Sequence, residues 1–370
     1  MAIRRRIFFD LHSWAGLKVS LFMFFIAFTG TLAVFAHDID WLITPEMRVD
    51  VADSRVSFGE LLDAARTRYP DWTPFYLSEP FEPWFASELI ALTPDGERRR
   101  IYLDPYRGEV TGDVNWFNAH RILRETHRHL MLPAKIGVPV VSLLAIPLMI
   151  SIITSFWIYK RWWKGFFKRP RSGRRRRFWG DLHRLTGVWS FAFLFIIALT
   201  SLWYLVESLG GHAPPAANMP GGDAERPPAE INGAQLDAMI EKAQHHFPGL
   251  DIDNIRFPLN HGQAVALLGQ TDVMLVRPRA NAIAFDAADG EEVHRNYAGD
   301  LSIHQRISEA ADPLHFGTFG GLTTRLLWFI FGLGMSALSL TGIYLYGLRL
   351  VNSDAPHRAE RMARKFPATA

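Results

Sequence analysis

Histidine is the residue type whose number and placement in this chain could do chemistry. There are 14 histidines and no cysteine, which excludes disulfides, thiolate metal sites and cysteine nucleophiles. Asp-Leu-His followed by glycine four residues later occurs at His12 with Gly16 and again at His183 with Gly187. One neutral imidazole from each of two helices can fill both axial positions of a haem iron. His12 and His183 are therefore candidate haem ligands.

A second pair of histidines occupies matching places further along the chain. His127 and His315 are 188 residues apart, and each precedes an apolar stretch. An ionisable side chain at a membrane boundary costs free energy unless it has a partner, so such residues are functional candidates. A single histidine near a helix end is usually just hydrated, but four in a duplicated arrangement favour two haems, one held by each pair.

The two glycines of the repeated motif allow two interpretations. Gly16 and Gly187 fall one helical turn after the histidines, on the same face, where a flat macrocycle needs a gap. Glycine also lets membrane helices pack closely, and the Thr-Gly pairs at 29–30 and 341–342 share that interpretation. Both roles are open for Gly16 and Gly187.

Two further histidines are alternative ligands for the haem of His127 and His315, which we call the outer haem. His37 follows the first apolar stretch, and His129 lies two residues after His127. Pro133 interrupts the approach to the second apolar stretch, so the assignment of the outer pair is less secure than that of His12 and His183. His212 lies in the expected linker, and five histidines of the outer loops have no repeated spacing and are interpreted as solvated surface: His245, His246, His261, His294 and His304.

Four apolar stretches must position these histidines. Each is long enough to cross about 30 Å of hydrocarbon at about 1.5 Å per helical residue. We expect membrane helices at residues 17–36, 136–159, 185–206 and 326–348.

The distribution of positive charge predicts the topology. Lys and Arg concentrate before the first stretch, between the second and third, and after the fourth, so these segments are expected to be cytoplasmic. Aromatic residues interleave with the charges between the second and third stretches, which indicates contact with membrane lipid rather than nucleic acid. The predicted cytoplasmic segments are residues 1–16 with the helix start, the basic loop 160–184 and the tail 349–370; the outer domains are residues 37–135 and 207–325.

The chain is an internal duplication. Thr29 and Thr200 are 171 residues apart, the same offset as His12 and His183, and Thr154 matches Thr341 in the later helices. Each outer segment has a helical start, at 58–69 and 234–247, then short strand-like runs and a closing Asp-x-x-x-Gly turn. Residues 210–228, rich in Pro, Gly and Ala, are expected to be a linker. The predicted fold is a four-helix transmembrane bundle with two small α+β domains.

Four motifs give the chain a family resemblance. They are the segments 10–16, 127–130, 181–187 and 313–321, which read DLHSWAG, HRHL, DLHRLTG and PLHFGTFGG. Over nearly its full length the chain resembles the PepSY-associated transmembrane proteins of bacterial inner membranes, and its outer segments look like PepSY domains. The resemblance implies haem b in the helical bundle and reduction of ferric siderophores in the periplasm. One departure is serine at 201 and 155, where the repeats have Gly30 and Gly342.

The expected function is transfer of electrons across the membrane to a ferric siderophore, which releases the iron. A membrane quinol or a separate reductase would donate the electron. It would enter at the haem held by His12 and His183 and leave from the haem near His127 and His315. A loop containing Phe81, Trp84 and Phe85 is expected to be exposed and is a candidate contact for the siderophore. The alternatives are a haem-free PepSY sensor or protease-regulating module, and a transporter, which the helices disfavour because they lack charged residues near their middles.

Overall fold

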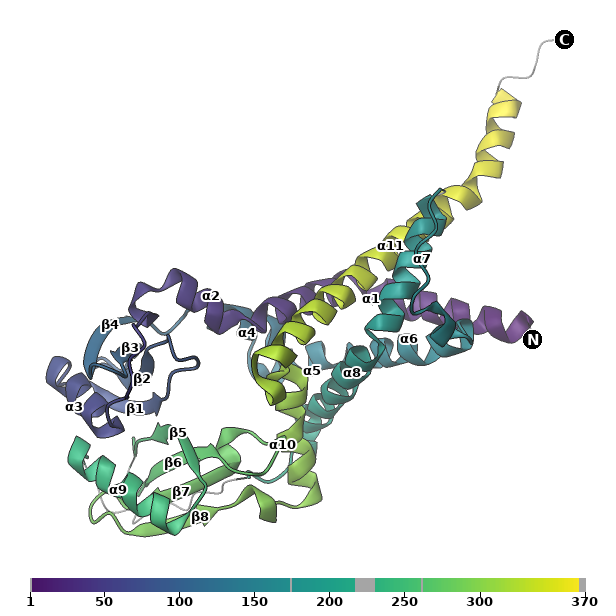
Figure 1. Cartoon of the computed structure of the whole chain (residues 1–370). Helices are drawn as coiled ribbons and strands as arrows, with labels where there is room; N and C mark the ends of the chain where they lie inside the picture. The colour runs from purple at the N-terminus through teal and green to yellow at the C-terminus, as the bar shows by residue number, and fades with distance from the viewer. Residues whose placement is uncertain (1, 174, 217–229, 261, 366–370) are drawn as a thin grey trace. The chain divides into compact units, whose positions relative to one another are not determined.

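The computed structural model describes residues 2–173, 175–216, 230–260 and 262–365 (Figure 1). We call the described residues up to 173 the first half and those from 175 the second half. The chain also divides into two compact units. The helical unit comprises Met1–Val34, Leu123–Gly211 and His315–Ala370, and the sheet unit comprises Phe35–Ile122 and His212–Leu314.

The helical unit is made of helices. They are α1 (Ala2–Ala33), α5 (Ala134–Ser142), α6 (Ala145–Ile158), α7 (Arg175–Trp189), α8 (Phe191–Val206) and α11 (Gly321–Lys365), and α4 (Ala119–His129) and α10 (Ile303–Phe316) lead into the unit. Pro139 lies inside α5, which ends three residues later, as expected where proline removes a backbone donor. The described residues contain four helices long and apolar enough to cross a membrane, Arg6–Ala33, Ala134–Ile158, Phe191–Gly211 and Thr318–Val351.

Helix α1 is central to the packing of the helical unit. It lies against α6 of its own half and α11 of the other half, and α7 also lies against α11 (Figure 1). Small residues allow the close approach: a Cβ added at Gly332 of α11 would lie 2.5 Å from Oγ1 of Thr31 on α1. Outward apolar side chains such as Leu21, 73% exposed, have no protein neighbour to cover them, as suits a lipid-facing surface.

The two predicted α+β domains share one continuous sheet. Its strands are β1 (Thr73–Ser78), β2 (Ser87–Leu92), β3 (Arg98–Asp104), β4 (Glu109–Asn115), β5 (Asp251–Arg256), β6 (Val265–Gln270), β7 (Asn281–Phe285) and β8 (Glu292–Asn296), in the antiparallel order β4-β3-β2-β1-β5-β6-β7-β8. The halves meet where β1 pairs with β5, with Leu77 opposite Ile255 and Ser78 opposite Asn254. Each half covers the edge strand of the other, so β1 and β5 are not open edges.

Helices α3 (Phe58–Arg68) and α9 (Gly233–His246) cap each other across the halves. The N–H of Gly59 donates to Asp237 at 2.9 Å, and the N–H of Gly233 donates to Asp63 at 2.8 Å. Only glycine fits at this contact, because a Cβ at Gly59 would lie 2.3 Å from the carbonyl oxygen of Gly233, and the reverse distance is also 2.3 Å. The helix starts therefore depend on carboxylates from the opposite half.

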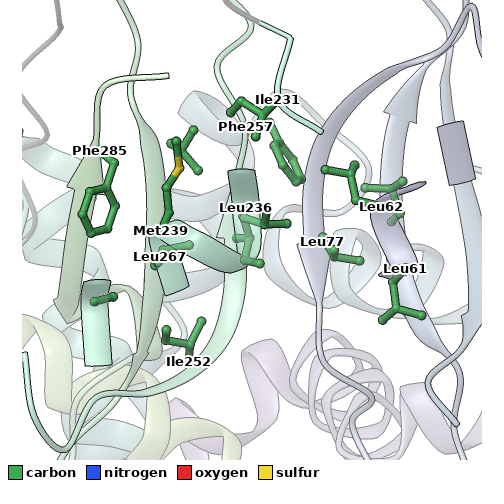
Figure 2. Close-up of a cluster of buried hydrophobic side chains, with 14 of the residues drawn as sticks. Leu61, Leu62, Leu77, Ile231, Leu236, Met239, Ile252, Phe257, Leu267 and Phe285 are labelled. Atoms are coloured by element: carbon green, nitrogen blue, oxygen red, sulfur yellow. The ribbon is translucent and has the colours of Figure 1, made fainter. Parts of the chain in front are cut away.

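The sheet unit has one apolar core shared by both halves. Figure 2 shows Leu61, Leu62 and Leu77 of the first half in the same cluster as Leu236 and Leu267 of the second. Their burial follows from the strand alternation and from the apolar faces of α3 and α9. We conclude that the two outer segments fold as a single unit.

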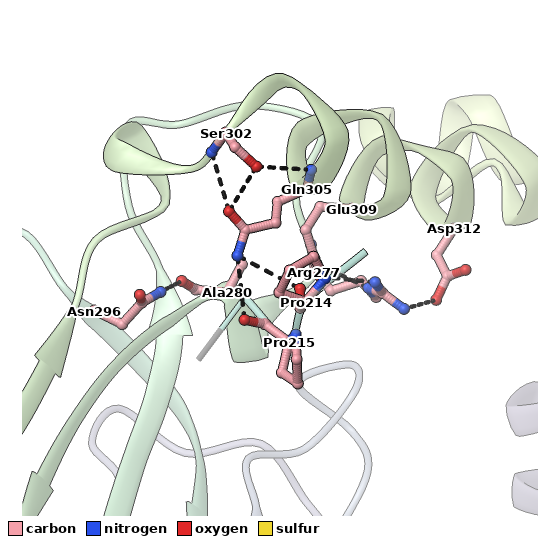
Figure 3. Close-up of polar contacts among 9 residues, drawn as sticks. All are labelled: Pro214, Pro215, Arg277, Ala280, Asn296, Ser302, Gln305, Glu309 and Asp312. Carbon is pink, nitrogen blue, oxygen red and sulfur yellow. Dashed lines mark hydrogen bonds and ion pairs between the residues drawn. The ribbon is translucent and has the colours of Figure 1, made fainter. Parts of the chain in front are cut away.

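Helix α10 is held by polar contacts within the second half (Figure 3). Arg277 donates to Glu309 at 2.6 and 2.8 Å and to Asp312 at 3.1 Å. Gln305 reaches back to the carbonyls of Pro214 and Pro215, at the start of the predicted linker. The rest of that linker, from residue 217 onward, lies outside the described residues.

Candidate functional site

The structure brings His12 and His183 together. His12 lies on α1 and His183 on α7, and their ring centres are 6.5 Å apart with the rings perpendicular. Two imidazoles bound on opposite sides of one metal, each with a metal–nitrogen bond of about 2 Å, have ring centres about 6 Å apart. This inner pair therefore has the spacing that axial ligation needs.

A helix of the first half orients His12. Its Nδ1 lies 3.1 Å from the carbonyl oxygen of Ser151 and 3.2 Å from Oγ1 of Thr154, both on α6. A carbonyl oxygen only accepts, so Nδ1 must carry the hydrogen. The lone pair of the ring is then on Nε2, the nitrogen left for a metal.

His183 is held in the same tautomer by α11. Its Nδ1 lies 2.8 Å from Oγ1 of Thr341, and that hydroxyl donates its own hydrogen to the carbonyl of Ala337 at 2.7 Å. The hydroxyl has one hydrogen, so Oγ1 can only accept from Nδ1–H. Both inner rings thus hold their lone pairs on Nε2.

The outer pair, His127 and His315, is also brought together. The ring centres are 6.1 Å apart at an angle of 42°. The Nδ1–H of His127 donates to the carbonyl of Ile26 on α1 at 2.9 Å. Gly30 makes room for this ring, because a Cβ there would lie 2.5 Å from Cε1 of His127. The close contact explains why glycine rather than alanine stands at position 30.

Helix α8 supports His315. Its Nδ1 lies 2.9 Å from Oγ1 of Thr200, whose hydroxyl donates to the carbonyl of Ile196 at 2.9 Å. The ring of Tyr204, one turn later, meets His315 edge-on at 5.2 Å. His315 therefore has the same kind of support as His183, from a threonine of another helix.

The residues fit a haem better than a bare metal ion. Among the described residues, no three or more histidine or acidic side chains are grouped so as to hold an ion. A haem brings four ring nitrogens of its own and needs only two axial ligands from the protein. A Cβ at Gly16 would meet nothing within 4 Å, and one at Gly187 only Leu338 at 3.8 Å. This open space one turn from the inner ligands is where the sequence predicts a gap for a macrocycle.

A family model described as the PepSY-associated TM region matches residues 9–349. The chain belongs to this family. None of the curated proteins compared with it matches. With its four apolar helices, this PepSY-associated chain is a multi-pass membrane protein. The family prediction made from the histidine motifs is thereby confirmed.

The alternative outer ligands are placed elsewhere. His37 belongs to the sheet unit, where its ring stacks on His120 at 4.0 Å and on Phe81 at 4.9 Å. His129 is buried, and its Nε2 pairs with Glu125, while its Nδ1 has no hydrogen-bond partner among the described residues. The stacked rings of His37 and His120 are closer together than the 6.1 Å that separates His127 and His315.

Other histidines of this PepSY-associated protein lie in the sheet unit. His245 and His246 end α9, and His246 pairs with Glu292 at 2.6 Å. His294 lies in β8, His304 in α10 and His212 after η3 (Glu207–Gly211), whereas His261 lies outside the described residues.

In the predicted siderophore loop, Phe81 and Trp84 are 46% and 44% exposed, but Phe85 is buried beside Met47 and Tyr102. The prediction of an exposed Phe85 was wrong, because this ring fills a satellite core.

The two copies of the Asp-Leu-His motif differ at their aspartates. Asp181 is buried and accepts hydrogen bonds from Arg171 at 2.8 and 3.0 Å and from Arg184 at 2.8 Å. Hydrogen bonding to Arg171 holds the pKa of Asp181 well below its usual range. Asp10 is exposed and pairs only loosely with Arg6, at 3.9 Å. The ion pair with Arg171 fastens the basic loop to the turn of α7 that precedes His183.

Sequence reasoning used the key threonines only as landmarks of the duplication. Thr154, Thr200 and Thr341 recur at the repeat offsets, and that recurrence was the signal that could have marked them as histidine partners. Arg325 was missed altogether: it is buried in the first turns of α11 and donates to the carbonyl of Val34 at 3.4 Å. Arg325 lies near the start of the span Thr318–Val351, whereas the sequence analysis considered charged residues only near the middles of the helices.

Proposed function

We propose that this protein is a bacterial inner-membrane haem b protein that passes electrons outward to reduce a periplasmic ferric siderophore. The observation that carries the proposal is the pair of facing imidazole sets, at 6.5 and 6.1 Å between ring centres. Each set consists of rings whose Nδ1 is bound to the protein, which is how histidine presents Nε2 to iron. Two axial imidazoles favour electron transfer over binding of an exogenous ligand.

The placement of the two sets supports transfer across the membrane. Gly30, which contacts His127, follows His12 by 18 residues in the continuous helix α1, or about 27 Å along the helix axis. That distance approaches the thickness of the hydrocarbon core. The basic segments place the His12 end on the cytoplasmic side under the positive-inside rule.

The protein residues would bind, orient and shield the redox groups. When bound, haem supplies the one-electron chemistry. His12 and His183 would hold one haem near the cytoplasmic face, and His127 and His315 would hold a second haem near the periplasmic face. One electron converts the ferric chelate to a ferrous one, whose hard oxygen ligands bind iron less tightly, so that iron is released. The electron donor in this proposal is a membrane quinol or a separate reductase.

Absorption spectroscopy tests the proposal. Full-length protein expressed with ample haem should show a Soret band and, after dithionite, the sharp α band of six-coordinate haem b. Adding a ferric hydroxamate siderophore to the reduced protein should reoxidise it, with ferrous iron trapped by a colorimetric chelator. Absence of any Soret band would reject the proposal and favour a haem-free PepSY sensor or protease-regulating module. Haem that is not reoxidised by ferric chelates would reject the siderophore as acceptor.

A further inference from the structure

A threonine hydroxyl lies beside Nδ1 of three of the four candidate ligands, and His12 has a second acceptor in the carbonyl oxygen of Ser151, at 3.1 Å. Thr154, Thr200 and Thr341 each place Oγ1 close to a histidine Nδ1, at 3.2, 2.9 and 2.8 Å respectively. Each hydroxyl donates to the carbonyl four residues earlier in its own helix, at 2.6, 2.9 and 2.7 Å. Its hydrogen is committed to that carbonyl, so the oxygen faces the histidine as an acceptor.

His127, the fourth candidate ligand, is supported by a carbonyl oxygen, as His12 is in part. The Nδ1–H of His127 donates directly to the carbonyl of Ile26, at 2.9 Å. Thr29, which corresponds to Thr200 in the duplication, donates to that same carbonyl at 3.1 Å and to the carbonyl of Phe25 at 2.9 Å. The threonine is present here but does not accept from the ring. All four rings nevertheless have hydrogen on Nδ1.

We propose that Thr200 and Thr341 are positioning residues that fix the histidine tautomer and set the redox potential of each haem separately, with Thr154 a second acceptor beside the Ser151 carbonyl. The inference rests on the proposed function, because it needs haem iron at both histidine pairs. Each threonine contacts only one pair: Thr154 and Thr341 the inner pair, and Thr200 the outer pair. Changing one of them is therefore expected to alter one haem and leave the other as an internal reference.

The effect on the redox potential comes from the oxygen that accepts the hydrogen bond of Nδ1–H. An oxygen that accepts from Nδ1–H raises the basicity of Nε2 and fixes the orientation of the ring. A more basic ligand stabilises ferric iron more than ferrous iron, which lowers the reduction potential. Removing the acceptor should therefore raise the potential of that haem alone.

The test compares threonine with valine and serine. Valine has the shape of threonine without the hydroxyl, and serine keeps the hydroxyl. In a redox titration of the full-length protein followed at the α band, Thr341→Val should shift the ferric–ferrous balance of the inner haem three- to tenfold toward the reduced form. That change corresponds to an increase of about 30 to 60 mV for a one-electron couple. Thr341→Ser should restore the original value, and Thr200→Val should shift the outer haem instead.

A second readout does not depend on haem. Nitrogen NMR of haem-free protein with isotope-labelled histidine reports which ring nitrogen carries hydrogen. His183 should be an Nδ1–H tautomer in the original protein and in Thr341→Ser, and a mixture of tautomers in Thr341→Val. Unchanged potentials in Thr341→Val, or equal effects of valine and serine, would overturn the inference while leaving the proposed function intact. If no haem binds, the proposed function fails, and the NMR result alone decides whether Thr341 positions His183.

Discussion

The helical unit and the sheet unit use the same duplication in opposite ways. In the helical unit each half supplies the hydrogen-bond acceptors of its own histidines: His12 is held by α6 and His183 by α11, and the two rings face each other across the halves. In the sheet unit the support itself crosses, because Asp237 caps α3 and Asp63 caps α9. A substitution in the helical unit should therefore act on one histidine pair, whereas one in the sheet unit should act on the opposite half.

The largest effect should come from removing one inner ligand. His12→Ala leaves His183 without a facing imidazole but leaves Thr200 and Ile26 in place around the outer pair. We expect loss of the inner haem, about half of the total, with the outer haem spectrum unchanged. Haem extraction and quantification measure this. His245→Ala, an exposed histidine at the end of α9, should retain both haems.

Complete loss of haem from His12→Ala would contradict independent support within each half. It would mean that the two pairs depend on each other, as the two caps of the sheet unit do. Full retention would remove His12 from the ligand set.

The next effect concerns the contact between Gly30 and His127. In Gly30→Ala the new Cβ would lie 2.5 Å from Cε1 and 2.7 Å from Nδ1 of the ring, so the ring must move. A misplaced ligand should weaken binding of the outer haem by about tenfold or more. The matched control is Gly347→Ala, because a Cβ there meets nothing within 4 Å. Normal outer haem in Gly30→Ala would show that His127 does not need its present position.

These predictions mark what the sequence could and could not establish. The inner pair was found because Asp-Leu-His and glycine recur in one continuous motif. The hydrogen bonds between threonine and histidine were not predicted, because a bond between two helices depends on how each helix is rotated about its axis. The periodicity of the sequence does not determine that rotation. The joining of the outer segments was missed for a similar reason: pairing of β1 with β5 is set by which edges are left uncovered, not by the pattern within either strand. Phe85 was misplaced because its proline-rich loop turns inward onto Tyr102.

A smaller effect should follow from breaking one of the crossed caps. Asp237→Ala removes the acceptor for the Gly59 N–H and for the hydroxyl of Ser57, at 2.9 and 2.6 Å. Loss of a helix cap costs about 1 to 2 kcal/mol. Hydrogen exchange with mass spectrometry should show faster exchange at the start of α3, in the other half. Glu241→Ala, an exposed acid on the same helix, should leave α3 unchanged. Faster exchange confined to α9 would contradict the crossed support.

The smallest effect concerns a carboxyl group at the junction of the halves. Asp253 lies on β5, and its carbonyl accepts from the N–H of Glu79 in the first half at 2.8 Å. Burial raises the pKa of Asp253 to about 6, with Glu79 and Asp251 adding to the shift. Between its unfolded value near 3.8 and about 6 the folded state binds more protons than the unfolded state, so stability falls as pH rises through this range. Above about pH 6 the destabilising effect of the charged carboxylate is fully present.

Asp253→Asn removes this cost without changing the size of the side chain. The variant should therefore melt at a higher temperature than the original protein at pH 7.5 and at the same temperature near pH 4, as followed by circular dichroism of the sheet. Because Asp253 is next to the strand pairing that joins the halves, the gain should also appear as slower amide exchange in both β1 and β5. A gain confined to β5 would mean that the junction is not a single cooperative unit, and the contrast with the helical unit would then be weaker than the crossed caps indicate.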